Sequence, residues 1–299
     1  MTDRGESSPC AVWPEGVLDQ QSFCELVRTE GATWARPDLP WRNTCDAYGV
    51  LVSEVMLQQT QVKRVLSFWP RFMESFPTLE ALADAPTSEV LLAWQGLGYN
   101  RRALALKRTA EECVAAGLDD LPDTYEGLLA LPGIGPATAA GVQAFARNRR
   151  GVYLETNVRA VFLYLLFPGE VQVSDKRLEP LVAMTCPEDD ARAWYYALLD
   201  FGAHLKRQVA NPSRRSATYT RQSAFSGSRR QKRAELVRIV LDTPGISVVA
   251  AHRALNDLEI GLGRPEVQPA LFESILADLV SEGFFKREGG ESPEDRLLP

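Results

Sequence analysis

Apolar residues recur at helical spacing over about residues 18–211, and the alternation typical of strands is nearly absent. One such series begins at Val62 and is preceded by Thr60, and Asp46 precedes another that runs over residues 48–58. Thr and Asp directly before an apolar run are typical helix N-caps, because their side-chain oxygens accept from free backbone amides. The pattern predicts an all-α region of short helices, with Asp46 and Thr60 as two of the caps.

A smaller unit follows near the C-terminus. Residues 211–228 are rich in Ser, Thr and Arg, which predicts a basic linker. Beyond it, apolar periodicity predicts helices near 232–241, 248–255 and 270–281, and the segment that starts at Gly283 is compatible with a short hairpin. Three helices and a β-hairpin are the outline of a winged helix, which we expect over residues 229–299. Residues 1–17 are polar and aperiodic, and we expect them to be disordered.

The composition is that of an ordinary globular protein, with 299 residues of which 45% are apolar and 24% charged. No run of about 18 apolar residues occurs, so we expect no membrane span. The N-terminus lacks the basic and apolar regions of a signal peptide. Five scattered cysteines without a CxxC pair argue against a disulfide framework and against metal ligation, and they suit a reducing cytoplasm.

The charge is unevenly distributed along the chain. The net charge is −6, yet residues 204–233 contain nine basic side chains and no acidic one, which leaves 24 basic residues against 39 acidic ones elsewhere. Such segregation is typical of a surface that meets a polyanion, but also of a solvated linker, and charge alone does not separate the two.

The string LPGIG at residues 131–135 lies between a helical stretch and a helix rich in small residues. Gly133 and Gly135 would allow a sharp turn with bare amides at the start of the next helix, which is a favourable seat for a phosphate. This is the helix-hairpin-helix pattern, which grips a DNA backbone without reading the sequence. A tight turn is the alternative for a lone Gly-x-Gly.

Two carboxylates stand out. Glu54 lies in SEVMLQQTQ, an otherwise uncharged helical run, and burial there would raise its pKa and make it a usable general acid. Glu155 follows a loop and is expected to cap a new helix. Its role is then either to favour the helix dipole or to face positive charge that develops on a substrate. For Glu54, the alternative is an ordinary exposed helix residue.

Five strings occur in the order found in MutY-type adenine DNA glycosylases of the helix-hairpin-helix base-excision superfamily: LPWR (39–42), SEVMLQQTQV (53–62), GLGY (96–99), LPGIG and LETNVRAV (154–161). The resemblance covers residues 20–205, and SEVMLQQT is highly specific. It implies an all-α, two-lobed glycosylase fold over residues 18–210, with one lobe from 48–150 and the other from 18–47 plus 151–210.

The resemblance also implies roles for single residues. Glu54 resembles the acid that protonates adenine at N7, and Glu155 stands where the family has an aspartate that stabilises the cationic sugar. The base must leave the duplex to be reached. Further positions match the family's base pocket or DNA contacts: Trp41, Arg42, Leu57, Gln59, Thr60, Leu97, Tyr99, Arg102, Gly133, Gly135 and Asn157.

Several positions depart from the family. Glu155 is one methylene longer than the aspartate, so either the backbone compensates, activity is weak or the substrate differs. Lys206 occupies the first iron–sulfur ligand position and no cysteine follows Cys186, so we expect no cofactor, although a monovalent or divalent cation at the hairpin fits the pattern. Ala137 replaces the lyase lysine, so no lyase activity is expected. Tyr196 stands where relatives carry Glu or Gln, and the Nudix-like C-terminal domain is missing.

The leading hypothesis is a monofunctional glycosylase that removes adenine mispaired with 8-oxoguanine or guanine in double-stranded DNA. We expect a monomer in the cytoplasm, associated with the nucleoid. One alternative is a mismatch glycosylase for uracil or thymine, and another is a lesion-binding protein with little catalysis. We further hypothesise that basic residues 206–221 supply phosphate contacts.

Overall fold

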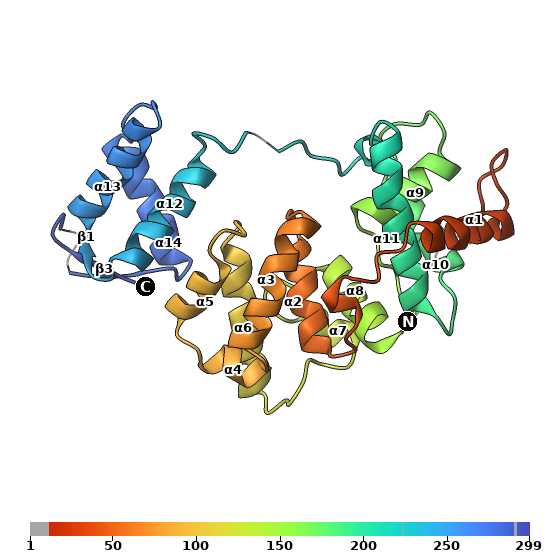
Figure 1. The fold of residues 1–299 in the computed structure, drawn as a ribbon, viewed down its shortest axis with the longest axis horizontal. Coiled ribbons are helices and arrows are strands. Elements are labelled where there is room, and N and C mark those ends of the chain that lie inside the picture. The colour runs from red at the N-terminus through yellow and green to blue at the C-terminus, as the bar shows by residue number, and fades with distance from the viewer. Residues whose placement is uncertain (1–11, 223, 290–291) are drawn as a thin grey trace, which may run out of the picture. The chain divides into compact units, whose positions relative to one another are not determined.

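The computed structural model describes residues 12–222, 224–289 and 292–299 and consists mainly of short helices joined by loops (Figure 1). None of the helices in these ranges is long and apolar enough to cross a membrane. The first elements are α1 (Gln20–Thr33), η1 (Pro40–Arg42), α2 (Ala47–Leu57), α3 (Val62–Ser75), α4 (Leu79–Asp84), α5 (Thr87–Trp94), α6 (Arg101–Ala115) and α7 (Tyr125–Leu129). They are followed by α8 (Pro136–Arg147), α9 (Thr156–Leu166), α10 (Asp175–Thr185), α11 (Ala191–Gln208), η2 (Pro212–Arg215), α12 (Arg229–Asp242), β1 (Ile246–Ser247), α13 (Val248–Gly261), α14 (Pro269–Ser281), β2 (Lys286–Glu288) and β3 (Arg296–Leu298).

The chain divides into two compact units. Unit 1 combines Met1–Leu51 with Gly135–Thr220, and unit 2 combines Val52–Ile134 with Arg221–Pro299. The expected lobe boundary at residue 150 therefore differs from the observed one, which lies before α8. The reason is burial: most of α8 is buried and packs against α11 of unit 1.

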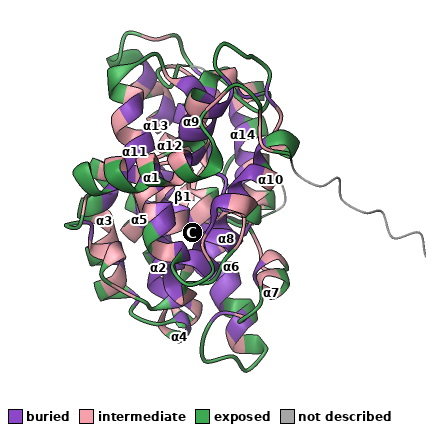
Figure 2. Ribbon diagram, turned by 90° about the vertical axis from the view of Figure 1, so that its right-hand side faces the viewer, coloured by how far each residue is buried: buried purple, intermediate pink, exposed green. Residues whose placement is uncertain are grey.

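Helix α11 is the centre of unit 1, where it packs against α9, α1 and α8. Two glycines allow close contact: a Cβ on Gly31 would lie 2.4 Å from Cβ of Ala197, and one on Gly202 would lie 2.3 Å from the carbonyl oxygen of Asn157. A side chain at either glycine would push the helices apart. Figure 2 shows the buried faces of these helices in purple. The backbone at Asn157 is consequently held by α11.

In unit 2, α6 packs against α4 and α5, and it also fixes the hairpin loop. The Thr109 hydroxyl of α6 donates to the carbonyl of Pro132 at 3.0 Å. Gly133 has φ +73°, and a Cβ there would lie 2.6 Å from Cβ of Ala105. Gly135 has φ −92° and open space around its missing Cβ. Only Gly133 is therefore required by the turn, whereas the sequence pattern assigned that role to both glycines.

The two predicted caps have different outcomes. Asp46 accepts from the amide of Gly49 at 2.6 Å at the start of α2, which confirms the prediction. The prediction for Thr60 is wrong, because the cap position of α3 is Gln61. Thr60 Oγ1 accepts instead from the guanidinium of Arg102 at 3.0 Å. Local sequence could not show this competing donor, which lies 42 residues away.

The C-terminal part of unit 2 has the expected winged-helix-like outline. Helices α12, α13 and α14 are followed by the hairpin of β2 and β3, and β1 adds a third strand in the order β1-β3-β2. Both strand pairs are antiparallel, with Leu297 opposite Ile246 on one side and Arg287 on the other. Helix α12 begins at Arg229 rather than near residue 232, because Ser228 caps it by accepting from Gln231.

The predicted linker is partly packed. Its first residues form η2, which lies against α9, and Val173 and Ser216 form a parallel bridge. The Arg215 guanidinium donates to the carbonyls of Leu163 (2.6 Å), Phe167 and Glu170 (3.3 Å). Arg215 thus caps the C-terminal end of α9, where a cation also suits the helix dipole.

Part of the expected N-terminal disorder lies outside the described residues, since residues 1–11 are not among them. In the remainder, Trp13 packs on Phe23 with ring centroids 5.6 Å apart, and its indole donates to the carbonyl of Leu18 at 2.6 Å. Residues 12–17 are accordingly anchored on α1, which the polar composition did not indicate.

Three of the nine basic residues in the segment 204–233, all on α12, form ion pairs with acids of the C-terminal part of unit 2. Arg229 and Arg233 bind Asp278 of α14, and Arg233 also binds Glu282. Lys232 binds Glu259, which is 1% exposed. These basic residues of α12 hold the winged-helix-like unit together, so the sequence run alone does not define a surface for a polyanion.

We predict that Arg215→Ala lowers the stability of the protein by about 1–2 kcal/mol, because the carbonyls at the end of α9 lose their donor. Arg214 is exposed and is the matched control. Thermal unfolding should show a lower Tm for Arg215→Ala and an unchanged Tm for Arg214→Ala. Equal Tm values for both variants would contradict the capping role.

Candidate active site

Glu54 lies on α2 in unit 2, and it is half-buried while every other residue from Ala47 to Met56 is buried. Glu54 is thus the one partly exposed residue in this otherwise buried stretch of α2.

Glu155 is the N-cap of α9 in unit 1, as the sequence predicted. Its Oε1 accepts from the amides of Asn157 at 2.6 Å and Val158 at 3.2 Å. Tyr195 fixes the approach to this cap, because its hydroxyl donates to the carbonyl of Gly151 and accepts from the amide of Tyr153. The carboxylate is therefore held at a helix N-terminus, which favours its negative charge.

Lys206 adds a positive charge to the surroundings of Glu155. It lies on α11 one turn beyond Gly202, which contacts Asn157. Burial lowers the pKa of the Lys206 ammonium, and the charge of Glu155 partly offsets that fall. A lysine at this position does not fit an iron–sulfur cluster, which needs thiolates.

The LPWR segment is anchored by a buried carboxylate that the sequence analysis did not single out. Asp200 is 3% exposed and binds Arg42 through two hydrogen bonds, at 2.7 and 2.9 Å. Arg36 donates to the same carboxylate at 2.5 Å. Trp41 is buried beside them. Asp200 is the one acidic residue of α11. Because a buried arginine needs an anionic partner, the sequence could have indicated Asp200 as the residue that pairs with Arg42.

Tyr196 lies in a stack. Its ring is parallel to that of Phe145 with centroids 4.6 Å apart, and the Arg42 guanidinium lies 4.3 Å from the Tyr196 ring centroid. The Nε atom of Arg42 is buried and has no hydrogen-bond partner among the described residues. Arg42 therefore keeps one donor unused while Asp200 fixes its orientation.

Gln59 and Tyr99 lie on two loops of unit 2 and adopt left-handed backbone conformations, with φ +57° and +50°. Arg102 holds both loops. Its guanidinium donates to the carbonyls of Val55 (2.7 Å), Met56 (2.9 Å), Gln58 and Gly98 (2.9 Å) and to Thr60 Oγ1. Glutamine and tyrosine rarely adopt left-handed backbone conformations, and the hydrogen bonds of Arg102 hold Gln59 and Tyr99 in them.

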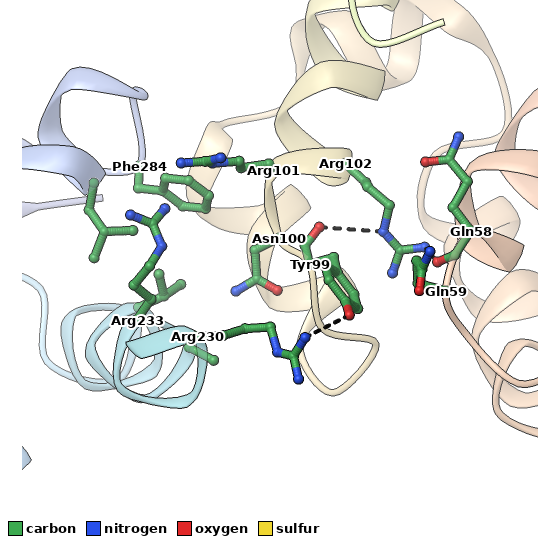
Figure 3. Close-up of a pocket in the computed structure, with 12 residues that line it drawn as sticks. Gln58, Gln59, Tyr99, Asn100, Arg101, Arg102, Arg230, Arg233 and Phe284 are labelled. Carbon is green, nitrogen blue, oxygen red and sulfur yellow. Dashed lines mark hydrogen bonds between the residues drawn. The ribbon is translucent and has the colours of Figure 1, made fainter. Parts of the chain in front are cut away.

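Burial lowers the pKa of Arg102 to about 10, so the group is still a cation at neutral pH. Its donors are occupied by protein carbonyls, and Figure 3 shows it turned toward Gln59 and Tyr99. The structure thus places Arg102 behind the two loops, where it positions them. The family match had assigned it to the DNA-binding set.

The remaining predicted residues fall into two groups. Leu97 is buried and Leu57 is half-buried next to the same loops of unit 2. Gly133 is exposed at the tip of the hairpin, and Gly135 immediately precedes α8. Within the described ranges, no three His, Cys, Asp or Glu side chains are grouped so that they could hold a metal ion. The expectation about cofactors stays a prediction.

Comparison with known proteins identifies the family. Residues 52–184 match the HhH-GPD superfamily of base excision DNA repair proteins. The chain is 33% identical over 261 residues to an adenine DNA glycosylase of Mycolicibacterium smegmatis, which covers 82% of this chain and 87% of the relative. The chain belongs to the adenine DNA glycosylase family. A match to the enzyme of Mycobacterium tuberculosis reaches 46% identity over 42% of this chain and 41% of that relative.

Solved structures support the family's fold. A thermostable thymine-DNA glycosylase is 26% identical with a TM-score of 0.55, over 62% of this chain and 86% of that one. An endonuclease III in a non-covalent DNA complex is 17% identical with a TM-score of 0.52, which shows the fold alone. The predicted all-α helix-hairpin-helix glycosylase fold is confirmed.

We predict that Arg102→Met lowers stability by about 2–4 kcal/mol, because several carbonyls lose their donor together. Arg102→Lys keeps the charge but not the planar set of donors, so its stability should lie between that of the unmodified protein and that of Arg102→Met. Arg71 is exposed on α3, and Arg71→Met is the control. Thermal unfolding is the measurement, and a loss no larger than that of the control would show that the loops do not depend on Arg102.

Proposed function

We propose that the chain is a monofunctional DNA glycosylase that hydrolyses the N-glycosidic bond of adenine mispaired with 8-oxoguanine or guanine. The observation that carries this proposal is the pair of carboxyl groups at the family positions, Glu54 on an apolar helix and Glu155 at a helix N-terminus. Membership of the adenine DNA glycosylase family supports the choice of base.

The two carboxyl groups have surroundings suited to different tasks. In its protonated form, Glu54 can give a proton to N7 of adenine and turn the base into a neutral leaving group. The Glu155 carboxylate, which accepts from two backbone amides, can stabilise the positive charge on the sugar. The bond between C1′ and N9 then breaks and releases neutral adenine, and water attacks the cationic C1′. The proton that this water loses passes to the carboxylate that Glu54 has become, so the acid is restored and no covalent link to DNA is left.

Base extrusion requires residues that occupy the vacated space in the duplex. Gln59 and Tyr99 are at the family positions for this role, and the turns that carry them are rigidly held by Arg102. Arg42 is at a family position of the base pocket, and its Nε donor is unused within the described residues. Ala137 has no amine, so we infer that strand cleavage does not follow base removal.

A mismatch glycosylase for thymine or uracil is the second candidate. The likeness to a thymine-DNA glycosylase favours it, and so does Tyr196, which stands where relatives carry Glu or Gln. Both candidates need Glu155 and the same extrusion of a base, so only the identity of the released base separates them.

We predict that duplexes with A opposite 8-oxoguanine or G are cleaved after alkali treatment, and that U·G and T·G duplexes are not. Glu54→Gln should lower the single-turnover rate at least about 10³-fold while duplex affinity changes less than about threefold, because only the proton donor is lost. Glu74 is exposed on α3, and Glu74→Gln is the matched control.

These outcomes separate the candidates. Release of uracil or thymine would favour the second candidate. Tight duplex binding without base release would favour a lesion-binding protein, and undiminished turnover in Glu54→Gln would show that the acid is another group.

We predict that Glu155→Asp lowers the single-turnover rate at least about tenfold with little change in Tm. Aspartate can still cap α9, but its carboxylate is withdrawn by about 1.5 Å, and contact with Gly202 prevents the backbone at Asn157 from following. A faster variant would show that glutamate at position 155 supports catalysis less well than aspartate, and that the site has not adapted to the longer side chain.

A further inference from the structure

Gln222 contacts both residues that the proposed function assigns to the DNA stack. Its Nε2 donates to Oε1 of Gln59 and to the hydroxyl of Tyr99. Both acceptors stand on the loops held by Arg102, so Gln222 bridges the two loops at their tips. A residue of the segment before α12 thus occupies the polar ends of the side chains that would enter DNA.

Arg230 of α12 engages the same tyrosine. Its Nη1 donates to the Tyr99 hydroxyl at 3.0 Å, and its guanidinium lies 5.4 Å from the centroid of the Tyr99 ring (Figure 3). The same guanidinium lies 5.3 Å from the centroid of the Phe225 ring, and Phe225 is 51% exposed. We call Gln222, Phe225 and Arg230 the cover.

Ion pairs at α6 hold the cover in place. Glu282, which follows α14, binds Arg101 through both carboxylate oxygens and also binds Arg233 of α12. Arg108 of α6 donates to the backbone carbonyl of Glu282. Burial raises the pKa of Glu282, but hydrogen bonds from Arg101 and Arg233 outweigh it and the pKa is lowered, so the group is an anion at neutral pH. Because α6 begins two residues after Tyr99, this anchor sets α12 beside the tyrosine.

Two cavities lie along this contact, and both are much smaller in volume than a segment of double-stranded DNA. One of about 250 Å³ is lined by Tyr99, Arg230 and Phe284, and one of about 520 Å³ is lined by Leu97, Gln222 and Phe225 among others. Bases in a stack are only about 3.4 Å apart, so Gln59 and Tyr99 cannot be flanked by bases while the cover is hydrogen-bonded to their tips.

We propose that the cover is an autoinhibitory contact, and that duplex DNA must displace Gln222, Phe225 and Arg230 before Gln59 and Tyr99 can enter the stack. The proposal rests on the proposed function for the roles of those two residues. Since only the open form binds, the apparent affinity for DNA is reduced by the fraction of open molecules.

The test is binding of the full-length chain to a duplex that carries a non-cleavable adenosine analogue opposite 8-oxoguanine. We expect Gln222→Ala and Arg230→Ala each to lower Kd by about 3- to 10-fold, which is the size of one lost hydrogen bond. Exposed residues of the same unit are the controls, and Gln268→Ala and Arg253→Ala should leave Kd unchanged or slightly higher.

Arg230→Ala is the decisive variant, because it removes a positive charge. If Arg230 contacts a phosphate, Kd rises and the salt dependence falls by about one ion, which would overturn the proposal. An unchanged Kd in both cover variants would overturn it as well.

Hydrogen exchange of the unmodified chain gives an independent measurement. On addition of the duplex, amides of residues 224–230 should exchange faster while those of residues 57–61 exchange more slowly. Slower exchange in both segments would show that the cover binds DNA and would overturn the proposal. Adenine release is followed with a cleavable duplex in parallel, and its absence would count against the proposed function alone.

Discussion

The guanidinium of Arg102 is the interaction on which the loops of Gln59 and Tyr99 in unit 2 depend. It replaces the missing hydrogen bonds at the end of α2 and fixes the turn that carries Tyr99, and it does so from within the protein. Gln59 and Tyr99, whose backbones are in left-handed conformations, are thereby held in position in the absence of DNA. Such preorganisation lowers the ordering cost when a ligand binds, because the loops do not have to find their conformation at that moment.

The side-chain ends of Gln59 and Tyr99 are contacted by residues 222 and 230, which on our proposal compete with DNA for this surface. The contact is held by charges at Glu282 that are paired across α6 and α12. The sequence run of basic residues looked like a surface for a polyanion, but several of its members neutralise acids of α13 and α14.

Two carboxylates of unit 1 differ in role: Asp200 is structural, and Glu155 is the proposed catalytic group. Asp200 is buried and is consumed by Arg36 and Arg42, which orients the LPWR segment. Glu155 is half-buried and bound only by backbone amides within its own cap, so its charge is stabilised without a salt bridge in the described structure that would neutralise it. Close packing of Gly202 on Asn157 fixes the position of that cap, which is why its side-chain length matters.

Sequence alone determined the helical class, the cap at Asp46, the cap at Glu155 and the winged-helix-like outline, because each is set by residues close together in the chain. The motif strings identified the family in the same way. The roles of Thr60, Arg102, Arg215 and Asp200 were decided only by tertiary structure. Each of these side chains has at least one partner more than 40 residues away, and no local pattern says which of several donors will reach a buried carbonyl or carboxylate.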